Sequence, residues 1–371
     1  MLPSQIVGVV AAILALLLLG ARLDAQSVDR SALNGQQLYQ DACAACHGSD
    51  GRGQPMAIRG FDIDPPDFTD CSLTTPEADL DWLSVVHQGG PARAFDRMMP
   101  AFGDELTEAQ IGLVIDHVRT FCTERGWPLG DLNLPRPFVT EKAFPENEAV
   151  LTTTIVPAHE RSIGNQFLYE HRVGRRGQYE VFVPLDLQES AVNRWQIGVG
   201  DIGAAYKHVL YDSRSRGSIL SVGGEFTLPT GSASKGLGKG VAMFEAFGTI
   251  SQTLPRDGFL HAHTGIEVPA DAERAAKETF WRLAIGKSFM QNRWGRAWSP
   301  MVEILGAREL EDGGEAEWDV LPQMQVSLST RQHVLLNIGV RTPITQRRDR
   351  QTSVLVYLLW DWFDGGLFSG W

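Results

Sequence analysis

The spacing of hydrophobic and polar residues divides the chain into two unlike parts. Between residues 30 and 125, apolar side chains recur at helical spacing, which predicts helices over 31–39, 77–86 and 107–125. In the last of these, Thr107 and Gln110 stand in the positions of a capping box. From residue 149 onward, about twelve segments of roughly nine to twelve residues are separated by turn residues, and many alternate with a period of two. The pattern predicts a small all-α unit followed by an all-β domain.

The alternating segments have one apolar face and one face that collects ionisable groups. In 177–187, the residues of the apolar face are Tyr179, Val181, Val183 and Leu185, and those opposite are Glu180, Phe182 and Asp186. In 257–268, the ionisable face carries His261, His263 and Glu267. Membrane-spanning strands need ~9–11 residues, and outer-membrane barrels have even strand numbers. We therefore predict an antiparallel up-and-down β-barrel of about twelve strands over 149–371, with a water-soluble β-domain as the alternative.

The aromatic residues near the end of the chain support a membrane barrel. The segment 352–363 is rich in aromatics and the sequence stops at Trp371. In these respects residues 150–371 resemble small outer-membrane channel-like barrels, and the resemblance implies outer-membrane lipid around the domain. His261 and His263 lie two apart on one strand face. They could bind a metal, but we favour a solvated pair in the lumen.

The sequence Cys43-Ala44-Ala45-Cys46-His47 carries the chemistry of the helical part. Two thiols one helical turn apart can both reach the vinyl groups of one porphyrin edge, and the histidine that follows can bind the iron as proximal ligand. A zinc half-site would need a second ligand pair, and a redox dithiol would need a preceding strand. Neither context is present in the sequence. We therefore predict one covalently attached haem c.

A methionine loop supplies the expected second iron ligand. Met98 and Met99 precede Pro100, between two predicted helices, and a thioether is the usual distal ligand in electron-transfer cytochromes. With the motif 43–47, this loop makes residues 30–125 resemble a class I monohaem cytochrome c. The resemblance implies Cys43 and Cys46 as thioether anchors, His47 as proximal ligand and Met99 as distal ligand. Met98 is the alternative ligand, a core-filling methionine is the plainer interpretation, and His87 is expected at the surface or beside the site.

Cys71 and Cys122 remain after the haem motif is assigned. In an oxidising compartment, an even pair inside one small domain most simply forms a disulfide. Two free thiols, or ligands to another group, are the alternatives.

The sequences on either side of the helical unit predict where the domains begin and end. Residues 6–20 are an almost unbroken apolar run, followed by a short segment that would be cleaved after Ala25. An uncleaved anchor is the alternative, although a span takes ~20 residues. Pro128, Pro135, Pro137 and Pro145 favour a linker that runs over a surface. The predicted division is 1–25 signal peptide, 26–125 cytochrome c domain, 126–148 linker and 149–371 β-barrel.

Charge is concentrated in the helical part. Residues 61–110 hold eleven acidic side chains against Arg93 and Arg97, within a chain of net charge −12. A solvated acidic face is the default interpretation. The alternative is a surface that steers a basic redox partner by long-range attraction.

These features predict an exported electron carrier rather than an enzyme that turns over a substrate. The haem domain would lie on the periplasmic side of the outer membrane, with a redox protein as partner and no nucleic acid. Two other functions stay open: an outer-membrane channel with a haem sensor or gating domain, and an extracellular metal-oxidising cytochrome–porin. The chain has a distant resemblance to fused cytochrome–porin proteins, which carry a shorter haem segment and a larger barrel. A lumen of about twelve strands is too narrow for a folded domain of ~100 residues.

Overall fold

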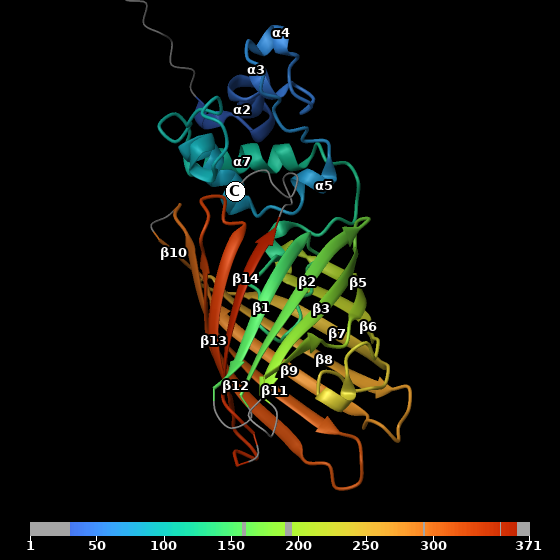
Figure 1. Cartoon of the computed structure of the whole chain (residues 1–371). Helices are drawn as coiled ribbons and strands as arrows, with labels where there is room; N and C mark the ends of the chain where they lie inside the picture. Colours follow the sequence, from blue (N-terminus) through green and yellow to red (C-terminus); the bar gives the residue numbers. More distant parts are fainter. Residues whose placement is uncertain (1–29, 158–160, 190–194, 292–293, 349, 362–371) are drawn as a thin grey trace, which may run out of the picture.

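The structure is a computed structural model that describes residues 30–157, 161–189, 195–291, 294–348 and 350–361. It consists of a helical unit seated on one rim of a β-barrel (Figure 1). The predicted signal peptide, 1–25, and the terminal Trp371 lie outside the described residues. Within the described residues, no helix has the length and apolar character that crossing a membrane requires.

The helical unit contains six α-helices. They are α2 (Gly35–Ala42), α3 (Ala44–His47), α4 (Met56–Arg59), α5 (Cys71–Thr74), α6 (Asp79–Gln88) and α7 (Glu108–Arg119). The three predicted helical segments overlap α2, α6 and α7. Short 3-10 turns add η1 (Arg30–Ala32), η2 (Gly90–Arg93) and, after the unit, η3 (Gly130–Leu132). The predicted capping box at Thr107 and Gln110 is present at the start of α7.

The β-domain is a single antiparallel sheet closed on itself. Its strands are β1 (Glu148–Val156), β2 (Ser162–Val173), β3 (Gly177–Glu189), β4 (Trp195–Val199), β5 (Gly203–Ser213), β6 (Ser218–Thr227), β7 (Met243–Leu254), β8 (Gly258–Pro269), β9 (Glu278–Lys287), β10 (Phe289–Met290), β11 (Ala297–Glu309), β12 (Ala316–Ser327), β13 (Val334–Pro343) and β14 (Ser353–Asp361). In the connection between β5 and β6, three residues form the 3-10 turn η4 (Arg214–Arg216).

Strand pairing confirms the predicted barrel. Apart from the short strands β4 and β10, each strand pairs with the next one along the chain, and β1 closes the ring on β14 with Glu148 opposite Asp361. Strands β4 and β5 both pair with β3, so the short strand β4 occupies the same wall position as β5. In the same way, β9 and β10 both pair with β11, so the short strand β10 shares the position of β9. The closed wall therefore has twelve strand positions. The even number and the up-and-down order are typical of outer-membrane barrels.

The two faces of the wall differ as the alternation predicted. Outward residues such as Tyr179, Val181 and Leu185 are exposed and apolar, while Glu180, between them in sequence, is buried in the lumen. An apolar outer surface is stable only against lipid or another apolar surface. This surface is therefore suited to a bilayer.

The two rims of the barrel carry different connections. On the rim beside the helical unit, the connections 174–176, 214–217 and 255–257 are short, and the wall both begins at Glu148 and ends at Asp361. On the far rim, the connections 228–242 and 344–352 are longer. Short turns on one side and long loops on the other are the usual asymmetry of bacterial outer-membrane barrels.

The segment before β1 does not run over a surface, and that prediction is wrong. Leu132, Ala143 and Phe144 form one buried cluster with Val209 and Ile219 of the wall. Phe138, between them, packs in the lumen against Tyr357 with ring centroids 5.0 Å apart. We call residues 133–147 the luminal loop. Prolines do break regular structure here, but the barrel interior, not solvent, surrounds the segment.

Candidate functional site

The core of the helical unit is built where α2 crosses α7. Gly35 lets the two backbones approach, because a Cβ there would lie 2.0 Å from the carbonyl oxygen of Leu113. Asn34 accepts a hydrogen bond from the N–H of Gln37 and begins α2 with a capping box. The buried core consists of Leu38, Tyr39, Ala44, Phe68, Val86, Leu106, Ile111, Val114, Ile115 and Val118. This core holds the cysteine–histidine motif and the methionine loop on one body.

The motif 43–47 lies at the junction of α2 and α3. The N–H of His47 donates to the carbonyl of Cys43 at 2.9 Å, so Cys43 and the residues after it form one helical turn. The Tyr39 hydroxyl donates to the carbonyl of Gly48 at 2.7 Å and fixes the end of that turn against α2. Cys43 and Cys46 are not in a disulfide. Burial raises the pKa of the Cys43 thiol to about 12, so this thiol stays protonated.

His47 has the properties of a metal-binding imidazole. Its ring stacks on Phe68 with centroids 4.8 Å apart, and burial lowers its pKa to about 4. The ring is therefore neutral near neutral pH and offers a nitrogen lone pair. Among the described residues, the buried Nδ1 atom has no hydrogen-bond partner. A buried, neutral imidazole with an unmatched nitrogen fits the donor set of a haem site.

The methionine loop folds onto the same core. The N–H of Gly90 donates to the carbonyl of Met99 at 2.9 Å, and a Cβ on Gly90 would contact the Met99 side chain at 3.2 Å. Met99 packs partly buried against the core that includes Phe68. Met98 is 44% exposed. This arrangement favours Met99 over Met98 as the candidate second ligand.

His87 faces the barrel rather than the core. Its ring lies 5.1 Å from that of Trp294, in the connection between β10 and β11, and its Nδ1 is 2.6 Å from the side-chain amide of Gln88. The position agrees with the expectation of a surface residue beside the site.

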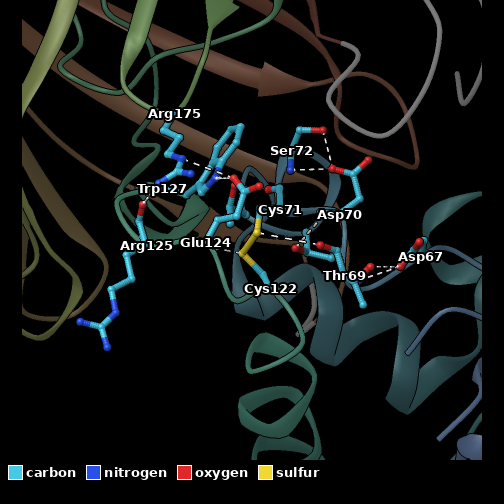
Figure 2. Close-up of a disulfide and its surroundings, with 12 residues drawn as sticks. Asp67, Thr69, Asp70, Cys71, Ser72, Cys122, Glu124, Arg125, Trp127 and Arg175 are labelled. Carbon is cyan, nitrogen blue, oxygen red and sulfur yellow. Dashed lines mark hydrogen bonds and ion pairs between the residues drawn. A yellow bond between two sulfur atoms is a disulfide. The ribbon is translucent and has the colours of Figure 1, made fainter. Parts of the chain in front are cut away.

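Cys71 and Cys122 form a disulfide, 51 residues apart in sequence (Figure 2). It joins α5 to the segment that follows α7. Asp70 caps α5 by accepting from the N–H of Ser72 at 2.9 Å. On the other side of the bond, Glu124 accepts from the Trp127 indole at 3.0 Å and pairs with Arg175 of the β2–β3 turn. The disulfide therefore lies where the helical unit meets the barrel.

Acidic residues of the helical unit meet basic side chains of the barrel rim. Glu77 lies 2.9 Å from the Nε2 atom of His333. Arg214, in η4, forms ion pairs with Asp79 and, at 3.3 Å, with Asp131. These pairs join residues more than eighty positions apart, so no local pattern in the sequence could have revealed them.

The rim contacts perturb the carboxylates unequally. Burial opposes ionisation of Glu77, but His333, Arg119 and Arg331 outweigh it and lower the Glu77 pKa. For Asp131, burial and then the neighbouring Asp79 raise the pKa. At the rim, Glu77 therefore ionises more readily than an ordinary glutamate, and Asp131 ionises less readily than an ordinary aspartate.

A buried basic side chain of the helical unit, Arg93, also contacts the rim. The Arg93 guanidinium is 3% exposed, donates to the carbonyl of Trp294 at 2.8 Å and pairs with Asp81 at 2.8 Å. Arg331 of the barrel donates to the carbonyl of Arg93 at 3.2 Å and covers the ring of Phe95. The methionine loop, which begins here, is therefore attached to the barrel as well as to its own core.

Comparison with known proteins finds one family match and several similar solved structures. Residues 30–118 match the family model of the cbb3-type cytochrome c oxidase subunit III. None of the curated proteins matches the chain. Among solved structures, 58% of the chain is similar to the KdgM porin (9% identity, 99% of that chain, TM-score 0.39), to the NanC porin (6%, 98%, 0.40) and to LpxR from Salmonella typhimurium (8%, 100%, 0.38).

The chain is a cytochrome c-type domain fused to a closed, twelve-stranded β-barrel. The cytochrome match implies a haem cofactor and electron transfer, and the barrel is of the outer-membrane type. For the barrel, the strand order and the two faces of the wall carry this conclusion.

Proposed function

We propose that this protein is a one-electron carrier tethered to the outer membrane, with a single haem c on its periplasmic side. Cys43 and Cys46 would be the two thioether anchors, His47 the proximal ligand and Met99 the distal ligand. The observation that carries the proposal is the convergence of the motif 43–47 and Met99 on one buried core. A haem held by His and Met exchanges one electron between two iron states, and the methionine raises the potential.

The residues of the chain favour a relay over substrate turnover. His47 and Met99 would hold the iron from two sides, which would leave no coordination position for a substrate. A hydrogen bond from the Gly90 N–H to the Met99 carbonyl holds Met99 in place. Stacking on the Phe68 ring holds His47 in place. A metal-oxidising enzyme would instead need a route for its substrate to reach this buried core.

The difference between the two rims supports a periplasmic placement of the haem domain. The helical unit lies beside the short turns and beside both ends of the wall. In bacterial outer-membrane barrels, the short turns face the periplasm and the long loops face outward. A periplasmic haem domain could receive electrons from a soluble redox protein. We expect this partner to be basic, because Asp62, Asp64, Asp96 and Asp104 are exposed on the helical unit.

Membrane fractionation with a haem stain tests the proposal. The full chain, expressed with cytochrome c maturation, is expected in the outer-membrane fraction as a detergent-extracted protein with covalently bound haem. A reductive titration should give one single-electron transition. A mature protein without bound haem would contradict the redox function, and one that stays soluble without detergent would contradict the anchor. Cys46→Ala, which keeps the barrel, should remain in the membrane with much less covalent haem.

A further inference from the structure

The luminal loop, residues 133–147, is bound by the inside of the barrel along almost its whole length. Wall side chains that donate to its carbonyl oxygens are His261, Tyr357, Arg282, Thr249, Lys207 and Ser221. Wall side chains that accept from its N–H groups are Glu303, His263, Ser251 and Gln178. These residues come from eight of the twelve strand positions, namely β3, β5, β6, β7, β8, β9, β11 and β14. A buried peptide group without a partner is costly, so this set of partners stabilises the loop in the lumen.

Among these wall residues, Glu303 binds several groups of the loop at once. Its carboxylate, which is fully buried, accepts from three consecutive N–H groups, those of Phe138, Val139 and Thr140, at 2.6–3.3 Å. The Thr140 hydroxyl and the Gln323 amide also donate to it, at 2.7 and 2.6 Å. Hydrogen bonds to a charged group are stronger than those between neutral groups. One wall residue thus fixes the turn at the middle of the loop.

Ion pairs hold the two arms of the loop. Arg136, on the first arm, pairs with the buried carboxylates of Glu148 and Glu170, the second at 2.8 Å. On the second arm, Lys207 of the wall pairs with Glu141, and Lys142 pairs with Glu146 at 2.6 Å. Most of these side chains are at least nine-tenths buried. Removing one partner of such a pair is strongly destabilising, because the other charge is left buried alone.

Apolar packing fills the remaining space at the level of the loop. Phe138 packs against two clusters of the wall, whose members are Val150, Tyr357, Leu359, Leu305, Leu321 and Leu355. The loop therefore contributes charge, peptide groups and an aromatic ring to one continuous layer across the lumen. Beyond this layer, a polar cavity of about 310 Å³ is lined by luminal residues of β1, β2 and β3, including Thr152, Gln166 and Asp186.

We propose that the luminal loop is a built-in closure, so that the intact protein does not conduct ions, and that the barrel conducts only when the loop leaves the wall. A twelve-stranded wall alone would enclose a water-filled channel. Here the loop occupies that channel on the side of the cytochrome domain, and the polar cavity lies between the strands farther from that domain. The gate and the cytochrome domain are covalently continuous through residues 123–132.

Conductance of the haem-loaded full chain in planar bilayers tests this proposal. The wild-type protein should give no resolvable channel steps. In a variant with residues 136–142 replaced by Gly and Ser at equal length, Arg136, Phe138, Glu141 and Lys142 are removed, and steps should appear. The matched control makes the same replacement in residues 270–276, the connection between β8 and β9 on the far rim, and should stay silent. Steps from the wild type, or silence from a folded loop variant, would overturn the closure.

Folding of each variant is checked by its heat-modifiable gel mobility with the haem stain. If the loop replacement does not fold, Glu303→Gln takes its place, because it keeps the size of the side chain and removes the charge that binds the three N–H groups. This variant should give brief openings that the wild type lacks. Its control is Glu267→Gln, whose partner is Lys239 rather than the loop. Equal silence of folded Glu303→Gln and Glu267→Gln would contradict the role of Glu303 as the anchor of a gate.

Discussion

Glu77 of the cytochrome domain lies 2.9 Å from His333 of the barrel, and the other ring nitrogen of His333 lies 3.1 Å from Asp361. His333 therefore lies between two carboxylates, one from each part of the chain. Because Glu77 precedes α6 and Asp361 ends the last wall strand, this one side chain joins the cytochrome domain to the seam of the barrel.

Replacing Glu77 by Gln should destabilise the docked protein in a pH-dependent way. The Glu77 pKa is below its ordinary value of 4.5, since His333, Arg119 and Arg331 outweigh burial. A lowered carboxyl pKa stabilises the fold above 4.5, and this contribution is lost as the pH falls through the lowered pKa. We expect a loss of about 1.5–3 kcal/mol at neutral pH that shrinks in acid. Denaturant unfolding in detergent measures it, and Asp104→Asn, an exposed change, is the control. If the difference in unfolding free energy between wild type and Glu77→Gln stays constant as the pH falls, the stabilisation does not come from the ionised Glu77 carboxylate.

Met99→Ala should remove the distal iron ligand, whereas Met98→Ala should not. Met99 packs on the core and Met98 is exposed. We expect the Met99 variant to lose the long-wavelength iron–sulfur charge-transfer band of the oxidised protein. Its potential should fall by a sizeable part of the ~0.8 V range that axial ligands set. Absorption spectra and a redox titration measure both, and the reverse result, with the band lost only in Met98→Ala, would assign Met98 instead.

Removing the disulfide should destabilise the cytochrome domain. The bond closes a loop of 51 residues between Cys71 and Cys122, for which chain entropy predicts roughly 4 kcal/mol, within a usual range of about 2–5. The double variant Cys71→Ala, Cys122→Ala should show this loss in unfolding followed by haem absorbance. The single variant Cys71→Ala leaves the Cys122 thiol free to pair with Cys43 or Cys46, so it should also bind less haem. Unchanged stability of the double variant would refute the prediction.

Electron transfer from a small basic redox protein should slow as salt is added. Attraction between exposed charges is screened over ~10 Å at 0.1 M ionic strength. The triple variant Asp62→Asn, Asp64→Asn, Asp104→Asn should react more slowly at low salt and with a flatter salt dependence, by stopped-flow kinetics. The control makes the same change of charge on the far side, with Asp271→Asn, Glu273→Gln and Glu311→Gln. A wild-type rate that does not depend on ionic strength would remove the steering hypothesis.

The barrel and the haem motif could be predicted because their signals are local. Each wall residue faces either lipid or the lumen, so a period of two survives in every strand whatever its partner is. The motif 43–47 needs only one helical turn. By contrast, the contacts of Glu77 and Asp79 with His333 and Arg214 depend on how two finished domains meet. Part of the acidic excess that suggested a separate basic partner is thus used inside the chain.

The luminal loop could not be predicted because it has no period of its own. Its peptide groups are satisfied by side chains from distant strands rather than by neighbours, so prolines do not exclude it from the interior. The interpretation of His261 and His263 as a solvated pair is wrong for the same reason. Both are buried, and they bind the loop at Pro135 and Glu141. The remaining signal was charge: Arg136 of the loop pairs with Glu170, an inward carboxylate of a predicted strand.

Both arms of the luminal loop leave through the same rim. Leu132 and Phe144 share one cluster near the cytochrome domain, and β1 begins four residues after Phe144. The loop therefore enters and leaves the lumen by one rim and does not run through the barrel from end to end. It can withdraw without a free chain end passing through the lumen. It can come out and return as a unit while all twelve strand positions stay paired, so opening is topologically reversible and leaves the lipid-facing cylinder intact.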